Sequence, residues 1–166
     1  MEFLNQLGQF FTNEILLVPA VAWLVAQLLK TLINGVVHKE WSAERLWGDG
    51  GMPSGHSATV SSLATMCGIT CGFGSPTFAL SFIFAVVVMH DAVGVRREAG
   101  KQAVTLKKLA ALVNGAISDP DKRIRTEKLK EFIGHTPMQV FFGALLGIVV
   151  SVVYVVIAKV PYMGFA

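Results

Sequence analysis

Two histidines in this chain stand where polar, glycine-containing stretches give way to apolar runs that suit helices. The first, His56, lies in the stretch from Gly50 to Val60, which reads GGMPSGHSATV. Glycines let a backbone approach a ligand closely, and the hydroxyl of Ser54 or Ser57 can cap the following helix. The first N–H groups and the positive dipole end of that helix then face the loop. Such a pocket favours phosphate, and His56 could pass protons within it.

The surroundings of His135 mirror those of His56. Thr136 is a good N-cap and Pro137 a good first helical residue for the long apolar segment that follows. Two histidines therefore precede two predicted helix N-termini.

Cations stand at the ends of two other apolar segments. Lys30 is near the end of the first, and the pair Arg96-Arg97 follows the third. Imidazoles, N–H donors and cations together suit phosphoryl transfer through a phosphohistidine, in which one imidazole attacks phosphorus and the other protonates the leaving oxygen. Because the cations would hold the phosphoryl oxygens as charge redistributes, we expect neither a metal nor another cofactor.

The composition is that of an integral membrane protein. Of the 166 residues, 53% are hydrophobic and 15% are charged, and the mean hydropathy is +0.58, which is unusual for a soluble domain. The net charge is +3, but no aromatic-interleaved basic patch accompanies it, so we expect no nucleic-acid partner. Membrane topology explains the charge better.

We expect an all-α fold, a polytopic bundle of about four transmembrane helices that forms a single membrane domain over residues 1–166. Apolar runs predict spans at approximately 14–37, 57–73, 76–91 and 138–158. Asn13 is the expected cap of the first span. The second run is rich in Ser, Thr, Gly and Ala, as expected for a helix packed against other helices rather than lipid. Residues 38–56 are predicted to be a surface loop that carries His56.

Two further helical segments are predicted outside these spans. Residues 2–11 have apolar side chains at near-helical spacing, which favours an interfacial helix or else a frayed start. Residues 94–134 form a predicted cytoplasmic helical insert, in which an apolar stripe lies opposite basic residues and a second short helix begins at Thr126. The stripe consists of Val95, Ala99, Ala103, Leu106, Ala110, Val113 and Ile117.

With four spans, the loop before His56 and segment 91–137 lie on the same side of the membrane. Every candidate catalytic group then shares that side. Of the 14 Lys and Arg residues, only Lys159 falls on the opposite side. The positive-inside rule therefore makes the catalytic side cytoplasmic.

Several blocks of the chain carry a resemblance to one superfamily. They are Pro53-Ser54-Gly55-His56 within Gly50 to Ala58, Gly134-His135 with Val140 and Gly143 within Leu129 to Gly147, and Ala22-Trp23, Gln27, Lys30, Asp91-Ala92, Gly94-Val95-Arg96-Arg97 and Ala99-Gly100. On these residues the chain resembles the type 2 phosphatidic acid phosphatase and vanadium-dependent haloperoxidase superfamily, and most closely its short, divergent bacterial branch. The resemblance implies a place in the bacterial inner (plasma) membrane.

The resemblance also implies roles for the site residues. His135 would be the nucleophile and His56 the general acid. The phosphate-binding groups would be Lys30, Ser54, Gly55 and an arginine, either Arg96 or Arg97. The implied activity is vanadate-sensitive hydrolysis of a lipid phosphate or a polyprenyl (di)phosphate.

The chain departs from the superfamily pattern at two cationic positions. Val37-His38 stands in place of an Arg-Pro pair, and Arg45 is the candidate substitute. Leu129 stands in place of an arginine six residues before the second histidine, a role that would pass to Arg96 or Arg97.

A third departure concerns the partner of the nucleophile. Gln139 replaces an aspartate four residues after His135. Its neutral amide can orient the imidazole but cannot stabilise an imidazolium as a carboxylate does. Asp91 or Glu131 is the candidate source of that negative charge.

Other functions stay open beside the phosphatase. A catalytically weak lipid-phosphate binding or transport protein would keep the anion site, and vanadate-dependent halide oxidation, ranked last, would use the same pocket. The expected partners are the lipid phosphate substrate, membrane lipids and a possible homodimer through small-residue faces. Those faces comprise Ala58, Ser61, Ser62, Ala64, Gly68, Gly143 and Gly147.

Overall fold

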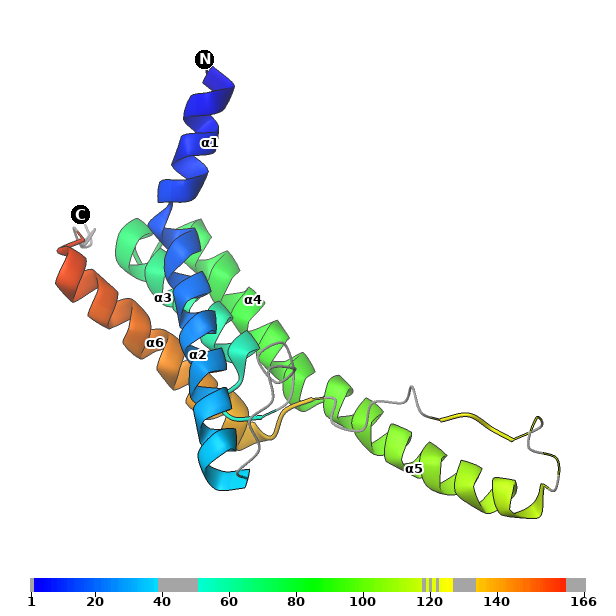
Figure 1. Cartoon of the computed structure of the whole chain (residues 1–166). Coiled ribbons are helices and arrows are strands. Elements are labelled where there is room, and N and C mark those ends of the chain that lie inside the picture. Colours follow the sequence, from blue (N-terminus) through cyan, green and yellow to red (C-terminus); the bar gives the residue numbers. More distant parts are fainter. Residues whose placement is uncertain are drawn as a thin grey trace.

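The computed structural model of the chain describes residues 2–38, 51–117, 119, 121, 123–126 and 134–160. Within these ranges the fold is all-helical and contains no β-strand. The helices are α1 (Glu2–Thr12), α2 (Glu14–His38), α3 (Gly55–Cys71), α4 (Pro76–Val93), α5 (Val95–Ala116) and α6 (Pro137–Ala158). In Figure 1, α2, α3, α4 and α6 form a bundle, α1 continues beyond one end and α5 projects from the other.

Helix α3 is the centre of the bundle. It packs along α2, α4 and α6, and its buried positions are mostly small, including Ala58, Ser62 and Gly68. Small side chains let neighbouring backbones approach closely, which is how helices associate where lipid supplies no hydrophobic driving force. The Ser, Thr, Gly and Ala residues of this segment therefore pack against other helices, as the sequence predicted.

Three helical stretches in the described part of the chain are long and apolar enough to cross a membrane. They are Glu14–Val36, Pro76–Ala116, which joins α4 to α5, and Pro137–Ala158. Helix α3, with 17 residues, is not among them, although residues 57–73 were expected as the second of about four spans, so the count of four stays a prediction. It is about 26 Å long. Three helices surround it, and its buried residues are mostly small or polar, unlike the large apolar residues of a lipid-facing helix.

The helix starts follow from local capping. The Asn13 side chain accepts the Ile15 N–H at 3.0 Å, as expected for the first span. At α3 the Ser54 hydroxyl accepts the Ser57 N–H at 3.3 Å, so the helix begins at Gly55. The prediction that residues 38–56 are all loop was wrong at this end, because this cap places His56 in the first turn of α3.

Helix α6 begins as predicted, with Thr136 as its N-cap and Pro137 as its first residue. Thr136 and Gln139 form a capping box, in which each side chain accepts the backbone N–H of the other residue. Gln139 therefore stabilises the start of α6, in addition to any role in positioning His135.

The closest approach in the bundle is between α6 and α3. A Cβ added to Gly143 would overlap the Ser54 carbonyl oxygen, and one added to Gly147 would overlap the Ala58 carbonyl oxygen. One turn further along, Ser151 and Ser62 share a 2.8 Å hydrogen bond. The small-residue faces considered for a homodimer are thus packed against each other within one chain at these positions.

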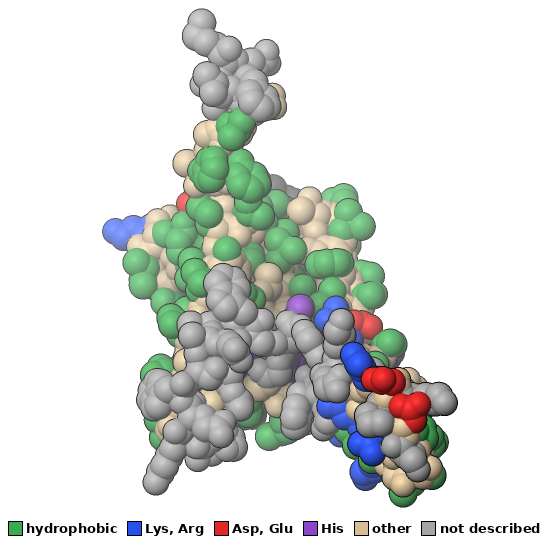
Figure 2. All heavy atoms as spheres, turned by 45° about the vertical axis from the view of Figure 1, so that its right-hand side comes forward, with side chains coloured by type: hydrophobic (Ala, Val, Ile, Leu, Met, Phe, Trp, Pro, Cys, Tyr) green, Lys and Arg blue, Asp and Glu red, His purple; other side chains and the backbone are tan. Residues whose placement is uncertain are grey.

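Helix α5 lies apart from the bundle core and, among the described helices, contacts only α4. The predicted apolar stripe is only partly covered, since Ala103 and Ala110 are buried while Leu106 is 55% exposed. Figure 2 shows hydrophobic side chains over the bundle and most of the visible charged side chains gathered over α5. The second short helix predicted from Thr126 lies largely in residues 127–133, outside the described residues.

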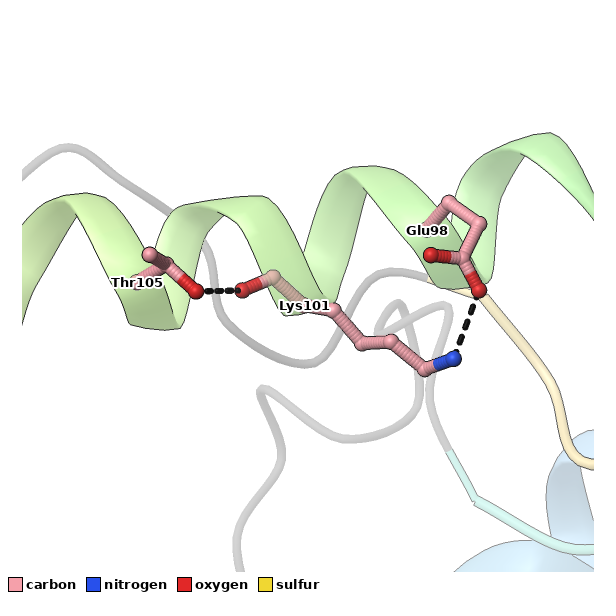
Figure 3. A network of polar contacts seen from close by, with 3 residues as sticks. All are labelled: Glu98, Lys101 and Thr105. Atoms are coloured by element: carbon pink, nitrogen blue, oxygen red, sulfur yellow. Dashed lines mark hydrogen bonds and ion pairs between the residues drawn. The ribbon is translucent and has the colours of Figure 1, made fainter.

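Two polar contacts on α5 lie within the helix itself. The Lys101 ammonium pairs with Glu98 at 2.6 Å, and the Thr105 hydroxyl donates to the Lys101 carbonyl at 3.1 Å (Figure 3). Both members of the ion pair are 59% exposed, so the pair adds little to stability. Helix α5 therefore presents a solvated polar side.

Replacing Gly147 by Ala should destabilise the bundle. The added Cβ would meet the Ala58 carbonyl and lie 2.9 Å from the Ser62 backbone nitrogen, and such overpacking costs about 1–3 kcal/mol. The measurement is the thermal unfolding midpoint in detergent, which should fall.

Gly115→Ala on α5 is the matched control for this change, because a Cβ there meets nothing within 4 Å. Alanine is also the better helix former, by up to about 1 kcal/mol. The control should leave the midpoint unchanged or raise it slightly. Equal midpoints for the two variants would contradict the close α3–α6 contact.

Candidate active site

The two histidines face each other at one end of the bundle. The ring centroids of His56 and His135 are 6.0 Å apart, with the ring planes tilted by 58°. This distance is about two hydrogen-bond lengths, so one oxygen-bearing group between the rings could contact both. The sequence predicted two histidines at two helix N-termini, and the fold brings those two termini together.

His135 is held by both its backbone and its side chain. It is 3% exposed, its N–H donates to the Ala92 carbonyl at the end of α4 at 2.9 Å, and its Nδ1 lies 3.2 Å from Gln139 Oε1. The last turn of α4 and the first turn of α6 therefore fix the position of the ring.

The Gln139 contact also fixes the tautomer of the neutral ring. The Thr136 backbone N–H donates to Gln139 Oε1 at 3.0 Å, which identifies that atom as the oxygen and not the amide nitrogen. An amide oxygen only accepts, so His135 Nδ1 must carry a proton. The lone pair of neutral His135 is then on Nε2, the nitrogen that would act as the nucleophile.

Gly134 allows the second histidine to reach this position. Its φ is +97°, which L side chains rarely adopt, and a Cβ there would overlap the Arg97 backbone nitrogen and lie 2.6 Å from Arg97 Cα. The backbone before His135 thus lies directly against the start of α5, the segment that carries Arg96 and Arg97.

The residues before His56 are packed from two sides. Ser54 is fully buried, its N–H donates to the Gln139 carbonyl at 3.0 Å, and its hydroxyl accepts from the Ser57 hydroxyl at 3.0 Å. A Cβ on Gly55 would lie 3.2 Å from Trp23 Cδ1 of α2. The helix start therefore fits between α6 and α2, where its first N–H groups point toward the site end of the bundle.

Lys30 belongs to the same end of the bundle. It is 5% exposed, and a Cβ on Gly51 would come within 3.0 Å of its Cγ, so the lysine stem runs along the loop that precedes α3. A buried ammonium needs compensation by polar or anionic groups. Lys30 therefore lies beside the Gly51 loop, and its role as a phosphate-binding cation stays a prediction.

The polar face of α2 extends beyond Lys30. Gln27 and Asn34 are 6% and 8% exposed, and they stand three residues before and four residues after Lys30, which places all three on one helix face. Sequence reasoning did not single out Asn34. The signal was present, because three polar residues at helical spacing inside an apolar span indicate a face turned to the protein interior.

Asp91 and the two arginines are arranged differently from the histidines. The Asp91 carboxylate accepts from Arg96 Nε at 2.8 Å, and the two side chains are 41% and 47% exposed. Gln139, rather than Asp91, contacts His135 Nδ1. The contact made by Asp91 is one that holds Arg96, and Arg97 is exposed on the same turn.

Some sequence candidates fall outside the residues that the structure describes. These are Arg45, Leu129 and Glu131, together with the side chains of Val37 and His38. Among the residues that are described, no three His, Cys, Asp or Glu side chains gather as a metal site would require.

Comparison with known families places this site in context. A family model described as the Divergent PAP2 family matches residues 11–150. The chain belongs to the Divergent PAP2 family. The matched range includes α2 through α5 and the first part of α6, and therefore both histidines of the candidate site. The sequence-based resemblance to a divergent bacterial branch of this superfamily is confirmed.

A relative of this Divergent PAP2 protein is the uncharacterized membrane protein YuiD of Bacillus subtilis (strain 168). The two are 41% identical over 151 residues, which is 87% of this chain and 96% of the relative. That relative supports a membrane location for the chain. No solved structure matches it.

Gly134→Ala should destabilise this Divergent PAP2 protein, because the added Cβ overlaps the Arg97 backbone and the positive φ adds strain. Together these effects should cost on the order of 1–3 kcal/mol, seen as a lower thermal unfolding midpoint in detergent.

Gly134→Asn separates the two causes. Asparagine tolerates positive φ better than alanine, but it also carries a Cβ, so steric overlap predicts a loss at least as large. An asparagine variant as stable as the wild type would show that the backbone of residue 134 does not lie against Arg97.

Proposed function

We propose that this chain is a membrane phosphatase that hydrolyses a lipid phosphate or polyprenyl (di)phosphate through a phosphohistidine intermediate. The observation that carries the proposal is the pair of neighbouring imidazoles, His56 and His135, whose ring centroids are 6.0 Å apart. Gln139 holds the proton on His135 Nδ1, which leaves the lone pair of the neutral ring on Nε2. Membership of the Divergent PAP2 family supports the same chemistry.

The proposed reaction has two steps that share one geometry. His135 Nε2 attacks phosphorus, the bond from phosphorus to the leaving oxygen breaks, and protonated His56 gives its proton to that oxygen. Water then attacks the phosphohistidine with His56 as general base. Phosphate leaves, and both imidazoles return to their starting states.

Several groups would hold the phosphoryl oxygens during this transfer. Two helix N-termini, those of α3 and α6, supply N–H groups and positive dipole ends, and Ser54 and Gly55 form the first of them. Lys30 lies beside the same loop. Of the two arginines, Arg96 is the preferred candidate, because its ion pair with Asp91 fixes the orientation of its side chain.

The proposed setting is the inner (plasma) membrane of a bacterium, with the site on the cytoplasmic side. In Figure 1, the starts of α3 and α6 and the ends of α2 and α4 lie at the end of the bundle from which α5 projects. Most of the Lys and Arg residues stand in the sequence segments that connect these helix ends. The positive-inside rule therefore favours the cytoplasm for this end of the bundle.

Detergent-solubilised wild type should release phosphate from at least one of several lipid phosphates, and His135→Ala should lose about 100-fold or more of that rate. Orthovanadate should inhibit the wild type, because it mimics the phosphoryl group in the oxyanion pocket. If wild type and His135→Ala release phosphate equally across all substrates, the phosphatase assignment fails.

Gln139→Glu tests the orientation of the nucleophile. Glutamate keeps the capping box and the acceptor for His135 Nδ1, and it adds a charge-assisted hydrogen bond to the imidazolium. Turnover should be unchanged or raised, by up to roughly fivefold for about 1 kcal/mol.

The matched comparison for this change is Gln139→Leu, which is similar in size but removes the acceptor. It should lower turnover. A large loss of turnover in the glutamate variant, measured in the purified protein, would contradict the orienting role of Gln139.

One observation favours a second candidate function, that of a catalytically weak lipid-phosphate binding or transport protein. The side chain that contacts His135 Nδ1 is a neutral amide, which orients the ring but does not stabilise the positive charge that the imidazole acquires when Nε2 bonds to phosphorus. Binding of a lipid phosphate without phosphate release above the His135→Ala background would select this function.

A further inference from the structure

An apolar groove lies directly beside the candidate phosphate site. It runs between α2 and α6, has a volume of about 300 Å³, and is walled by Leu29 and Ile33 on one side and by Phe142, Leu145, Leu146 and Val149 on the other. At its head it is lined by Met52 and Pro53, the two residues before the Ser54 cap. We name it the α2–α6 groove.

The groove and the anion site share chain segments at both walls. Leu29 directly precedes Lys30 on α2, and Pro53 directly precedes Ser54. On α6, Phe142 stands one turn beyond Gln139, the partner of His135. Residues that line the groove therefore directly adjoin or closely follow residues of the proposed anion site on α2, on the loop before α3 and on α6.

A second and larger apolar groove, the α4–α6 groove, opens on the other side of α6. Its volume is about 500 Å³, and its lining includes Ser61, Phe78, Met89 and Ile148. None of its lining residues belongs to segment 51–57 that precedes and begins α3. On α3 its first lining residue is Ser61, five residues beyond His56.

We propose that the α2–α6 groove binds the hydrocarbon chain of a phosphate-bearing lipid whose headgroup occupies the two-histidine site. This assignment rests on the proposed function. It concerns the hydrocarbon chain, the part of the substrate that the two-histidine site does not contact. Along α6 the groove extends from Phe142 to Val149, about 10 Å, which is two-thirds of the hydrocarbon depth of one leaflet, roughly 15 Å.

The groove acts by position more than by affinity. A hydrocarbon chain gains little on moving from lipid or detergent into an apolar protein groove, because both surroundings are apolar. A chain seated between α2 and α6 would instead fix where the phosphorus atom lies relative to His135. Misplacing a reacting atom by about 1 Å can cost roughly 100-fold in rate.

The test compares two neighbouring residues of α6 that line different grooves. Val149 lines the α2–α6 groove and Ile148 the α4–α6 groove, and they are 48% and 43% exposed. The measurement is kcat/KM for decyl phosphate divided by kcat/KM for ethyl phosphate, at one fixed detergent concentration. Ethyl phosphate is too short to extend along α6 to residue 149.

Val149→Trp should lower the decyl-to-ethyl ratio by at least about tenfold, because the indole fills the far part of the groove and displaces the longer chain together with its headgroup. Ile148→Trp should leave the ratio at the wild-type value. A fall for Ile148→Trp alone would assign the chain to the α4–α6 groove and overturn the proposal, as would two unchanged ratios. Repeating the comparison with a prenyl phosphate distinguishes an isoprenoid chain from an alkyl chain.

A second measurement does not require turnover. Decyl phosphate with a diazirine at its far end should label residues of the α2–α6 groove in wild type and in His135→Ala, and excess decyl phosphate should suppress the label. Label on α4, or no suppressible label, overturns the proposal. If wild type releases no phosphate but the groove is labelled, the phosphatase assignment fails while the chain site stands.

The same labelling distinguishes a lipid from a second copy of the chain in the groove. A neighbouring helix seated there would exclude the probe, and Val149→Trp would then lower the oligomeric mass measured in detergent. That pair of results overturns the lipid assignment.

Discussion

The contact between α6 and the first turns of α3 is the constraint on which the site depends. Gly143 and Gly147 bring the α6 backbone against the Ser54 and Ala58 carbonyls, and the Ser54 N–H donates to the Gln139 carbonyl. This contact sets the two helices side by side with their N-termini level. Because each histidine lies within two residues of its helix start, the contact also determines the distance between the two imidazoles.

Two helix N-termini at one level carry an electrostatic cost. Each has a partial charge of roughly +0.5, and Lys30 adds a full charge near the same loop. The Asp91 carboxylate near this end is paired with Arg96 and so cancels little of this potential at the histidines. An anion between the rings would offset the repulsion, which is the electrostatic reason for proposing a phosphate site there.

Local sequence signals predicted the helix starts well. Asn13, Thr136 and Pro137 cap or begin helices as expected, because these residue types act through hydrogen bonds and φ preferences within one turn. The same reasoning left Ser54 and Ser57 as alternatives at α3, and the choice of Ser54 moved His56 into the helix. The carbonyl that receives the Ser54 N–H comes from Gln139, a partner 85 positions along the chain that no local rule identifies.

Predictions that required tertiary contacts were less complete. The role of Gly134 follows from the Arg97 backbone lying against it, and the pairing of Asp91 with Arg96 follows from the turn between α4 and α5. The exposed side of Leu106 follows from α5 leaving the bundle, which an apolar stripe alone does not reveal. A stripe predicts that a helix has two faces, but its neighbours decide which face is covered.

The amide at residue 139 links the two candidate functions. A carboxylate there would stabilise a positively charged His135 ring, but it would also place negative charge beside a 3% exposed ring in the proposed phosphate pocket, where like charges repel. The neutral Gln139 keeps the pocket electropositive and holds the tautomer through Oε1. It therefore favours phosphate binding at some expense in nucleophile basicity. If the proposed site is correct, turnover and retention of a lipid phosphate compete, and the residue that accepts the hydrogen bond from His135 Nδ1 determines which of the two is favoured.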